Sequence, residues 1–152
     1  TNVVLLFCGV GEQDALLRER AKALGVESRV RFLGFRRDVA ALLGASDAFL
    51  FPSFQEGLPV SLMEAMAAGL PCVASRVRGS SDLLADGRGG ALCPPTDVAG
   101  LADGLRTILG DPALAAAMGA HNRETVAAYA LPEVRAHMAA LYNAQLAKGE
   151  AH

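Results

Sequence analysis

Two kinds of hydrophobic pattern alternate along the first two thirds of the chain. Short runs of mainly apolar residues predict buried strands at residues 3–8, 29–33, 48–51, 71–74 and 91–93. Helical spacing of apolar residues predicts helices at 12–24, at 38–43, between Pro59 and Gly69, and near 82–85. Apolar strands that alternate with helices are typical of a parallel sheet covered on both faces. We therefore expect an α/β, Rossmann-like parallel sheet flanked by helices.

From Thr96 onward the pattern is entirely helical. Asp111 followed by Pro112 predicts a helix start, with aspartate as the N-cap and proline at the first helical position. Pro132 predicts a further helix start after Leu131. The chain of 152 residues is long enough for one domain with its own core, so we expect a single domain over 1–152 with a helical C-terminal tail.

Composition narrows the classes of function. The chain is 52% hydrophobic and has a net charge of -2, which argues against a general nucleic-acid-binding protein. No uncharged apolar run approaches the ~18 residues that a membrane span needs, and the first residues lack a signal-peptide pattern. Cys8, Cys72 and Cys93 are odd in number and far apart, so we expect buried free thiols in a reducing compartment, which is typical of a cytoplasmic protein.

Four loops follow directly on predicted strands and carry glycine, serine or arginine; they lie at 9–11, 34–37, 52–57 and 75–81. In open parallel sheets, ligands bind outside the carboxyl ends of the strands. These loops are therefore expected to converge on one site. The alternative is that they are ordinary connections, since α/β proteins often have glycine and serine there.

Several kinds of site are excluded by missing motifs. The chain has neither the phosphate-binding loop of P-loop NTPases nor the G-x-S-x-G elbow of α/β-hydrolases. The glycine pair Gly9 and Gly11 does not complete the dinucleotide fingerprint, because Asp14 stands where the third glycine belongs. The histidines suggest no metal cluster, and no Asp-x-Asp pair could hold a metal diphosphate. A bound phosphate would be held by backbone amides and by arginine, with Arg36, Arg37, Arg76 and Arg78 as candidates.

Two glutamates stand out in the segment around the predicted helix that begins at Pro59. The free N–H groups of its first turn form a positive, anion-attracting end, and Gly57 would let a diphosphate approach the backbone closely. Glu56 would repel phosphate, so its expected partners are hydroxyl groups. Glu64 has apolar neighbours and no Lys or Arg three or four residues away. We expect it to be buried with a hydrogen-bonding partner such as a ribose diol, because an unpaired buried carboxylate is costly.

A capping box offers a second interpretation of Glu64. Ser61 and Glu64 have the S-x-x-E spacing, in which the serine caps the helix and the glutamate reaches back to the serine amide. This interpretation leaves Glu56 unexplained.

The same residues resemble a known family. Glu56 and Glu64 are separated by seven residues within PSFQEGLPVSLMEAMAAGLPCVAS, which resembles the E-x7-E motif of retaining glycosyltransferases with the GT-B fold, of the glycosyltransferase family 4 type. Gly34 after VRFL, Asp47 before AFLFPS, and the segment VRGSSDLLADGRGGALCPP also resemble the carboxyl-terminal domain of that family. The resemblance covers roughly residues 3–110, and the variant EGLPVSLMEA is most similar to glycosyltransferases of surface polysaccharides.

The resemblance implies a role for each matching position. Glu56 would act as the catalytic-site glutamate that contacts the hydroxyls of the donor sugar, and Glu64 would hold the ribose. The backbone of Gly57, Leu58, Pro59 and Val60 would hold the sugar and the diphosphate, and Gly34, Phe35 and Arg36 would lie beside the base. The donor would be a nucleotide sugar, with uridine as the expected base, and no metal or other cofactor would be needed.

The resemblance further implies that the chain is the donor-binding part of a hexosyl-type transferase. The family's domain begins with an earlier strand, whose loop bears an arginine and a lysine, and an amino-terminal domain binds a glycan or lipid-linked acceptor; this chain starts after both. We therefore expect the chain alone to be inactive, and the parent enzyme to be cytoplasmic or peripheral at the inner membrane face. Where the family often has Gly-Gly, this chain has Arg78 and Gly79.

By the same resemblance, the missing strand would lie between residues 3–8 and 48–51. The gap is expected to be closed by direct pairing of these two strands or by a neighbouring chain, which would make a dimer. Two other functions remain open: a GT-B-like sugar-nucleotide epimerase, and a non-catalytic nucleotide-binding or interaction module.

Overall fold

The computed structural model describes residues 3–149, with side chains for residues 3–146. The chain forms two compact units, Thr1–Val39 and Ala40–His152. Each unit contains parallel strands and helices, so the predicted α/β class is confirmed. The prediction that residues 1–152 make a single domain stays a prediction.

The first unit is a strand–helix–strand arrangement. Its elements are β1 (Leu5–Cys8), α1 (Asp14–Ala23), the short 3-10 helix η1 (Glu27–Arg29) and β2 (Val30–Gly34). β1 and β2 are parallel, with Phe7 paired to Phe32 in the register and the two rings stacked at 5.2 Å between centroids. The Arg18 guanidinium from α1 lies 4.3 Å from the centroid of the Phe32 ring. Ala21 is the one buried residue among the described residues of this unit.

The second unit is built on a three-stranded parallel sheet in the order β3–β4–β5. The strands are β3 (Phe49–Phe51), β4 (Cys72–Ser75) and β5 (Gly90–Cys93). β4 is in the middle and all four of its residues are buried. Burial on both faces explains why its sequence is a continuous run of small and apolar residues rather than an alternating one.

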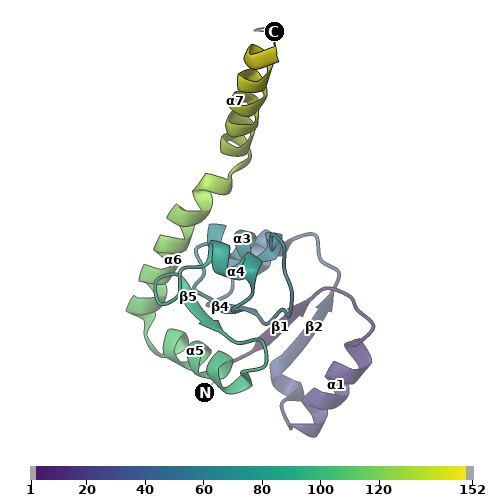
Figure 1. Cartoon of the computed structure of the whole chain (residues 1–152). Helices are drawn as coiled ribbons and strands as arrows, with labels where there is room; N and C mark the ends of the chain where they lie inside the picture. Colours follow the sequence, from purple (N-terminus) through teal and green to yellow (C-terminus); the bar gives the residue numbers. More distant parts are fainter. Residues whose placement is uncertain (1–2, 150–152) are drawn as a thin grey trace. The chain divides into compact units, whose positions relative to one another are not determined.

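Six α-helices complete the second unit: α2 (Val39–Gly44, whose first residue still belongs to the first unit), α3 (Val60–Ala67), α4 (Arg78–Leu83), α5 (Val98–Gly110), α6 (Pro112–Val126) and α7 (Leu131–Gly149). Figure 1 shows α3 and α4 on one side of the β4 and β5 ribbons and α5 on the other. The core under α5 and α6 is a cluster of Val73, Leu101, Ile108 and Met118. The helical tail is therefore confirmed, and α5 and α6 are part of the packed core.

Local signals place the helix ends. The Asp111 side chain accepts hydrogen bonds from the N–H groups of Ala113 and Leu114, both at 3.0 Å, so Asp111 is the predicted N-cap of α6. At the end of α3, Gly69 has a φ of +78° and its N–H donates to the Met66 carbonyl. The Leu70 N–H donates to the Ala65 carbonyl, which completes a Schellman motif.

A buried amide ties α6 to the strands of this unit. Asn122 is fully buried, and its Nδ2 donates to the carbonyls of Leu70 and Gly89, both at 2.7 Å. Leu70 precedes β4 and Gly89 precedes β5. The Asn122 side chain thus holds together the starts of β4 and β5. The positions of these two strands in turn place the loops that follow them.

Three expectations from the sequence are wrong in detail. α4 spans residues 78–83 instead of 82–85, so the second half of the expected loop at 75–81 is helical. Cys72 is buried, but Cys93 is half-buried and Cys8 is exposed. Residues 3–8 and 48–51 do not pair directly, because β1 and β3 belong to separate sheets. The alternative expectation, that a neighbouring chain pairs with these strands and forms a dimer, stays a prediction.

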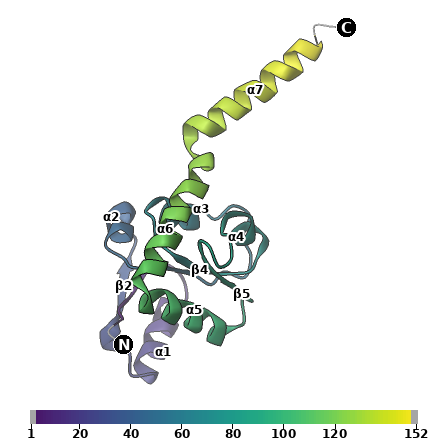
Figure 2. The same cartoon turned by 90° about the vertical axis from the view of Figure 1, so that its left-hand side faces the viewer.

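The described side chains of the last helix, α7, are all exposed. Figure 2 shows α7 continuing beyond the end of α6. Within residues 3–149, no helix is both long enough and apolar enough to cross a membrane.

Candidate functional site

The loop after β3 borders an open hollow of about 710 Å³ in the second unit. Its wall is formed by this loop together with the start of α4, and the lining residues are Phe54, Gln55, Glu56, Gly57, Val77, Arg78 and Asp82. Both segments follow directly on the carboxyl ends of neighbouring parallel strands, β3 and β4. The hollow therefore occupies the edge of the sheet at which open α/β folds bind their ligands.

Glu56 and Gly57, which the sequence singled out, both line this hollow. The Glu56 side chain is half-buried and has no hydrogen-bond or ion-pair partner among residues 3–149. Its carboxylate oxygens are thus free to accept hydrogen bonds from a ligand.

Gly57 has no structural need to be glycine. Its φ lies outside the left-handed region, and a Cβ added there would meet nothing within 4 Å. Neither backbone strain nor packing inside the protein therefore excludes a side chain at this position. The open space above its backbone leaves room for a ligand, and the close approach of a diphosphate stays a prediction.

The start of α3 carries unused backbone donors. Pro59 is the N-cap and Val60 the first helical residue, one position later than predicted. The Pro59 carbonyl accepts from the N–H groups of Leu62 and Met63, each at 3.1 Å. No backbone carbonyl among the described residues accepts from the N–H groups of Gly57, Leu58, Val60 and Ser61. These donors, with the helix dipole behind them, make this end of α3 attractive to an anion.

Glu64 lies inside α3 as predicted, but its setting differs from the expectation. The residue is exposed rather than buried, because the buried face of α3 consists of Leu62, Ala65 and Met66. The Glu64 side chain forms no hydrogen bond or ion pair within the described part of the chain. The capping-box interpretation is wrong, since Pro59 is the N-cap and no side chain caps this helix. Glu64 is also not among the residues that line the hollow.

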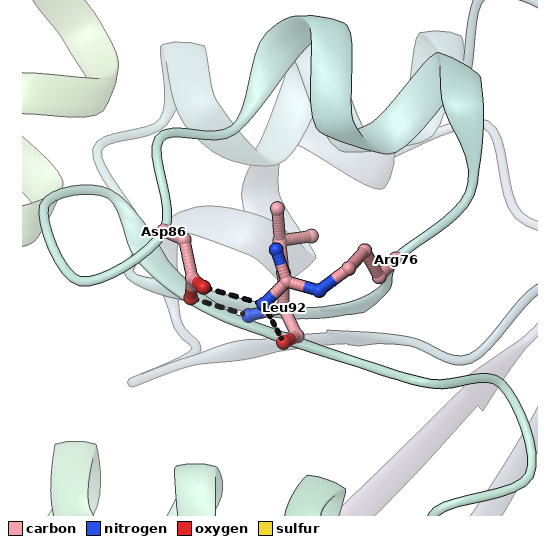
Figure 3. A network of polar contacts seen from close by, with 3 residues as sticks. All are labelled: Arg76, Asp86 and Leu92. Carbon is pink, nitrogen blue, oxygen red and sulfur yellow. Dashed lines mark hydrogen bonds and ion pairs between the residues drawn. The ribbon is translucent and has the colours of Figure 1, made fainter.

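Arg76, a candidate phosphate contact, is already engaged within the protein. Its Nη2 lies 2.5 Å from the Asp86 carboxylate and 2.7 Å from the Leu92 carbonyl, as Figure 3 shows. Asp86 Oδ1 in turn accepts from the Leu92 N–H at 2.9 Å. The hydrogen bond from Arg76 lowers the pKa of Asp86. This closed network fastens the turn before β5 to the segment after β4 and makes Arg76 a structural residue.

Arg78 is the arginine that reaches the hollow. Its side chain is 92% exposed and forms a 3.9 Å ion pair with Asp82, one turn later in α4. Such an exposed and long pair contributes little to stability and leaves the guanidinium able to contact a ligand.

Gly34, Phe35 and Arg36 lie in the first unit. Gly34 ends β2 with a φ of +62°, a conformation that favours glycine, and its carbonyl accepts from the Gly9 N–H at 2.8 Å. Phe35 is 71% exposed. Arg36 Nε lies 2.8 Å from the Asp38 carboxylate, and this hydrogen bond raises the pKa of Arg36 and lowers that of Asp38. The predicted convergence of this loop with the Glu56 loop stays a prediction.

Sequence reasoning did not single out four residues that line the hollow: Phe54, Gln55, Val77 and Asp82. Phe54, 74% exposed in a loop directly after a strand, carried a readable signal, since a large apolar side chain in such a place often serves a ligand. Val77 and Asp82 carried none, because their role depends on the position of α4.

Comparison with known proteins gives a consistent result. The sequence profile of the family described as "Glycosyl transferases group 1" matches residues 1–125. The chain is 39% identical over 122 residues to the N-acetyl-alpha-D-glucosaminyl L-malate synthase of Bacillus anthracis, covering 80% of this chain and 32% of that protein. It is 35% identical over 161 residues to the D-inositol 3-phosphate glycosyltransferase of Corynebacterium glutamicum, covering 99% of this chain and 38% of that protein. The chain thus spans about a third of the length of these relatives.

Solved structures show the same fold. A crystal structure of Anabaena HepE in complex with UDP superposes with a TM-score of 0.88 at 28% identity, covering 93% of this chain and 41% of that one. The sucrose-phosphate synthase of Thermosynechococcus elongatus superposes with a TM-score of 0.86 at 29% identity, covering 95% of this chain and 39% of that one. The GT-B type of fold predicted from the sequence is thereby confirmed. The chain belongs to the group 1 glycosyl transferases.

Proposed function

We propose that this chain is the donor-binding part of a retaining glycosyltransferase that uses a nucleotide sugar, with UDP as the nucleotide. The observation that carries the proposal is the hollow lined by the unpartnered Glu56 and by Gly57, next to free backbone donors at the start of α3. A carboxylate that can accept hydrogen bonds from hydroxyl groups lies next to N–H groups that can donate hydrogen bonds to an anion. This combination suits a ligand in which a sugar is joined to a diphosphate. The UDP-bound structures of HepE support the choice of nucleotide.

Each site residue receives a role in this proposal. Glu56 accepts hydrogen bonds from the sugar hydroxyls, and the backbone of Gly57, Leu58, Pro59 and Val60 faces the sugar and the diphosphate. Glu64 holds the ribose hydroxyls, for which its exposed and unpartnered carboxylate is suited. Gly34, Phe35 and Arg36 lie beside the base, where an exposed phenyl ring can stack.

The proposed reaction transfers the sugar to an acceptor hydroxyl. The bond between the anomeric carbon and the diphosphate oxygen breaks, and a bond to the acceptor oxygen forms with retained configuration. The proton of the acceptor hydroxyl passes to the leaving diphosphate or to water. Negative charge then grows on the leaving diphosphate. The free N–H groups at the start of α3 and the guanidinium of Arg78 are the groups available to stabilise it, with no metal assigned to this chain.

The acceptor is proposed to be a glycan or a lipid-linked sugar of a surface polysaccharide, bound by the parent enzyme outside this chain. Among the relatives, the lipopolysaccharide core biosynthesis glycosyltransferase LpsE of Rhizobium meliloti is 33% identical over 125 residues and supports this choice. We further propose a hexose-type donor, a cytoplasmic location at or near the membrane, and no transfer by this chain alone.

Thermal unfolding in the presence of nucleotides tests the proposal. A ligand at 100 times its dissociation constant stabilises the native state by about 2.7 kcal/mol, which for a chain of this length corresponds to a rise in Tm of roughly 5–10 °C. We expect UDP and UDP-sugars to raise the Tm in this way. Absence of any shift with the diphosphates of uridine, guanosine and adenosine would overturn the proposal.

A further inference from the structure

α4 approaches the Glu56 loop so closely that a side chain has no room between them. Gly79, the second residue of α4, is buried. A Cβ built on it would lie 2.5 Å from the Gly57 carbonyl oxygen and 2.9 Å from the Glu56 carbonyl oxygen. Both atoms belong to the backbone, so neither can turn aside. Because the φ of Gly79 is not in the left-handed region, space alone makes glycine necessary here.

The Glu56 loop has little else to fix its position. Residues 54–58 form no backbone-to-backbone hydrogen bond within the described chain. The side chain of Glu56 also lacks a partner among residues 3–149. Packing against α4 at Gly79 therefore sets where the loop stands.

The same helix also supplies residues to the wall of the hollow. Arg78 and Asp82 of α4 line it together with Glu56 and Gly57 of the loop. Gly79 thus lies at the contact between the two segments, and the distance between them depends on its lack of a side chain.

We infer that Gly79 is a positioning residue for the sugar part of the donor, which rests on the proposed function. Because glycine has no side chain, α4 can pack directly against the Glu56 loop. This packing holds the loop in the position in which the Glu56 carboxylate meets the sugar hydroxyls. A larger residue moves the loop away from α4 and widens the hollow. The nucleotide part of the donor is affected less, because Glu64 and the free N–H groups of Val60 and Ser61 lie on α3, outside the contact that Gly79 makes, and of the proposed diphosphate contacts only Gly57 meets Gly79 directly.

The test measures the ratio of the affinities for two ligands. Dissociation constants of UDP and of a UDP-sugar are measured by titration calorimetry for the wild type and for Gly79→Ala, with the Tm of each. We expect Gly79→Ala to weaken the UDP-sugar about 10- to 100-fold, the range for lost hydrogen bonds to a charged group, and UDP no more than about threefold. A ratio of the two affinities equal to that of the wild type would overturn the inference.

Gly104→Ala is the matched control. Gly104 lies in α5, and a Cβ there would meet Ala91 Cβ at 3.1 Å and Val73 Cγ1 at 3.3 Å, so crowding occurs in the core and away from the hollow. This variant is expected to lose stability without changing the ratio of affinities. An equal change of the ratio in both alanine variants would show that general loosening, and not the position of the Glu56 loop, is responsible.

Two further outcomes are decisive. If the folded wild type binds neither ligand, the proposed function fails and the inference fails with it. If Gly79→Ala does not fold, Leu83→Val replaces it, because Leu83 is the buried residue at the other end of α4 and a smaller side chain there loosens the packing of this helix. This variant is expected to lower the affinity for the UDP-sugar relative to UDP, and an unchanged ratio would overturn the inference.

Discussion

Glu64 is an exposed carboxylate on α3 without a partner in the described chain, so its removal leaves no buried group unsatisfied. We expect Glu64→Gln to keep the wild-type Tm. If the carboxylate holds the ribose diol, the variant binds UDP more weakly by about 1–3 kcal/mol, which is roughly 5- to 150-fold. Calorimetric titration with UDP measures the effect, and Glu124→Gln, an exposed position on α6, is the control. An affinity equal to that of the wild type would refute the ribose role.

The buried thiol of Cys72 is expected to make the free energy of unfolding depend on pH. Its burial in the middle strand raises the pKa of the thiol to about 12. In the unfolded chain the thiol ionises at about 8.5, so between these two values the native state holds a proton that the unfolded state has lost. The contribution of Cys72 to the free energy of unfolding is therefore complete below pH 8.5 and falls as the pH rises toward 12.

Cys72→Ala isolates this dependence. The variant loses the buried sulfur at every pH, but it has no thiol to titrate at this position. We expect the stability difference between the wild type and Cys72→Ala to shrink between about pH 8.5 and 10.5, as measured by urea unfolding. A difference that stays constant over this range would mean that the thiol is not protected from ionisation.

The end of α3 depends on Gly69. Its φ of +78° is strained for any residue with a Cβ, and an added Cβ would also displace the guanidinium of Arg123. We expect Gly69→Ala to lower the free energy of unfolding by about 1–2 kcal/mol. Gly110→Ala is the control, because its Cβ would meet nothing and its φ is not positive. Equal midpoints of chemical unfolding for the two variants would contradict this account of the helix end.

Elements with local signals were predictable, and those that depend on tertiary packing were not. The five strands were predicted because each is a run of mainly apolar residues. The end of α3 was predicted because Gly69 and Pro71, two stop signals, stand only two positions apart. α4 was placed too late in the chain because the Gly-Ser-Ser segment after Arg78 favours a loop. In the structure this segment is helical and Gly79 packs closely against the Glu56 loop. No local sequence pattern reveals such a tertiary contact.

The candidate site follows the same division. Glu56 and Gly57 were predicted from the motif and line the hollow. Arg78 was one candidate among four arginines until the structure placed it at the hollow and showed Arg76 bound to Asp86. The expected burial of Glu64 failed because apolar neighbours in sequence point to a different face of the helix.

The molecule as a whole consists of two compact units. Gly34, Phe35 and Arg36 belong to the first unit, and the Glu56 loop and α3 belong to the second. The proposed function names a nucleotide sugar as the ligand of these residues. Binding of such a ligand is therefore the central claim about this chain.

Titration calorimetry of the chain with UDP and with UDP-sugars tests that claim most directly. The account predicts saturable binding of UDP at one site and tighter binding of at least one UDP-sugar. In Glu56→Gln, UDP should bind as in the wild type, while the advantage of the UDP-sugar should fall about tenfold or more, because the lost contacts are hydrogen bonds from sugar hydroxyls to a carboxylate. A folded wild-type chain that binds neither UDP nor any UDP-sugar would contradict the account.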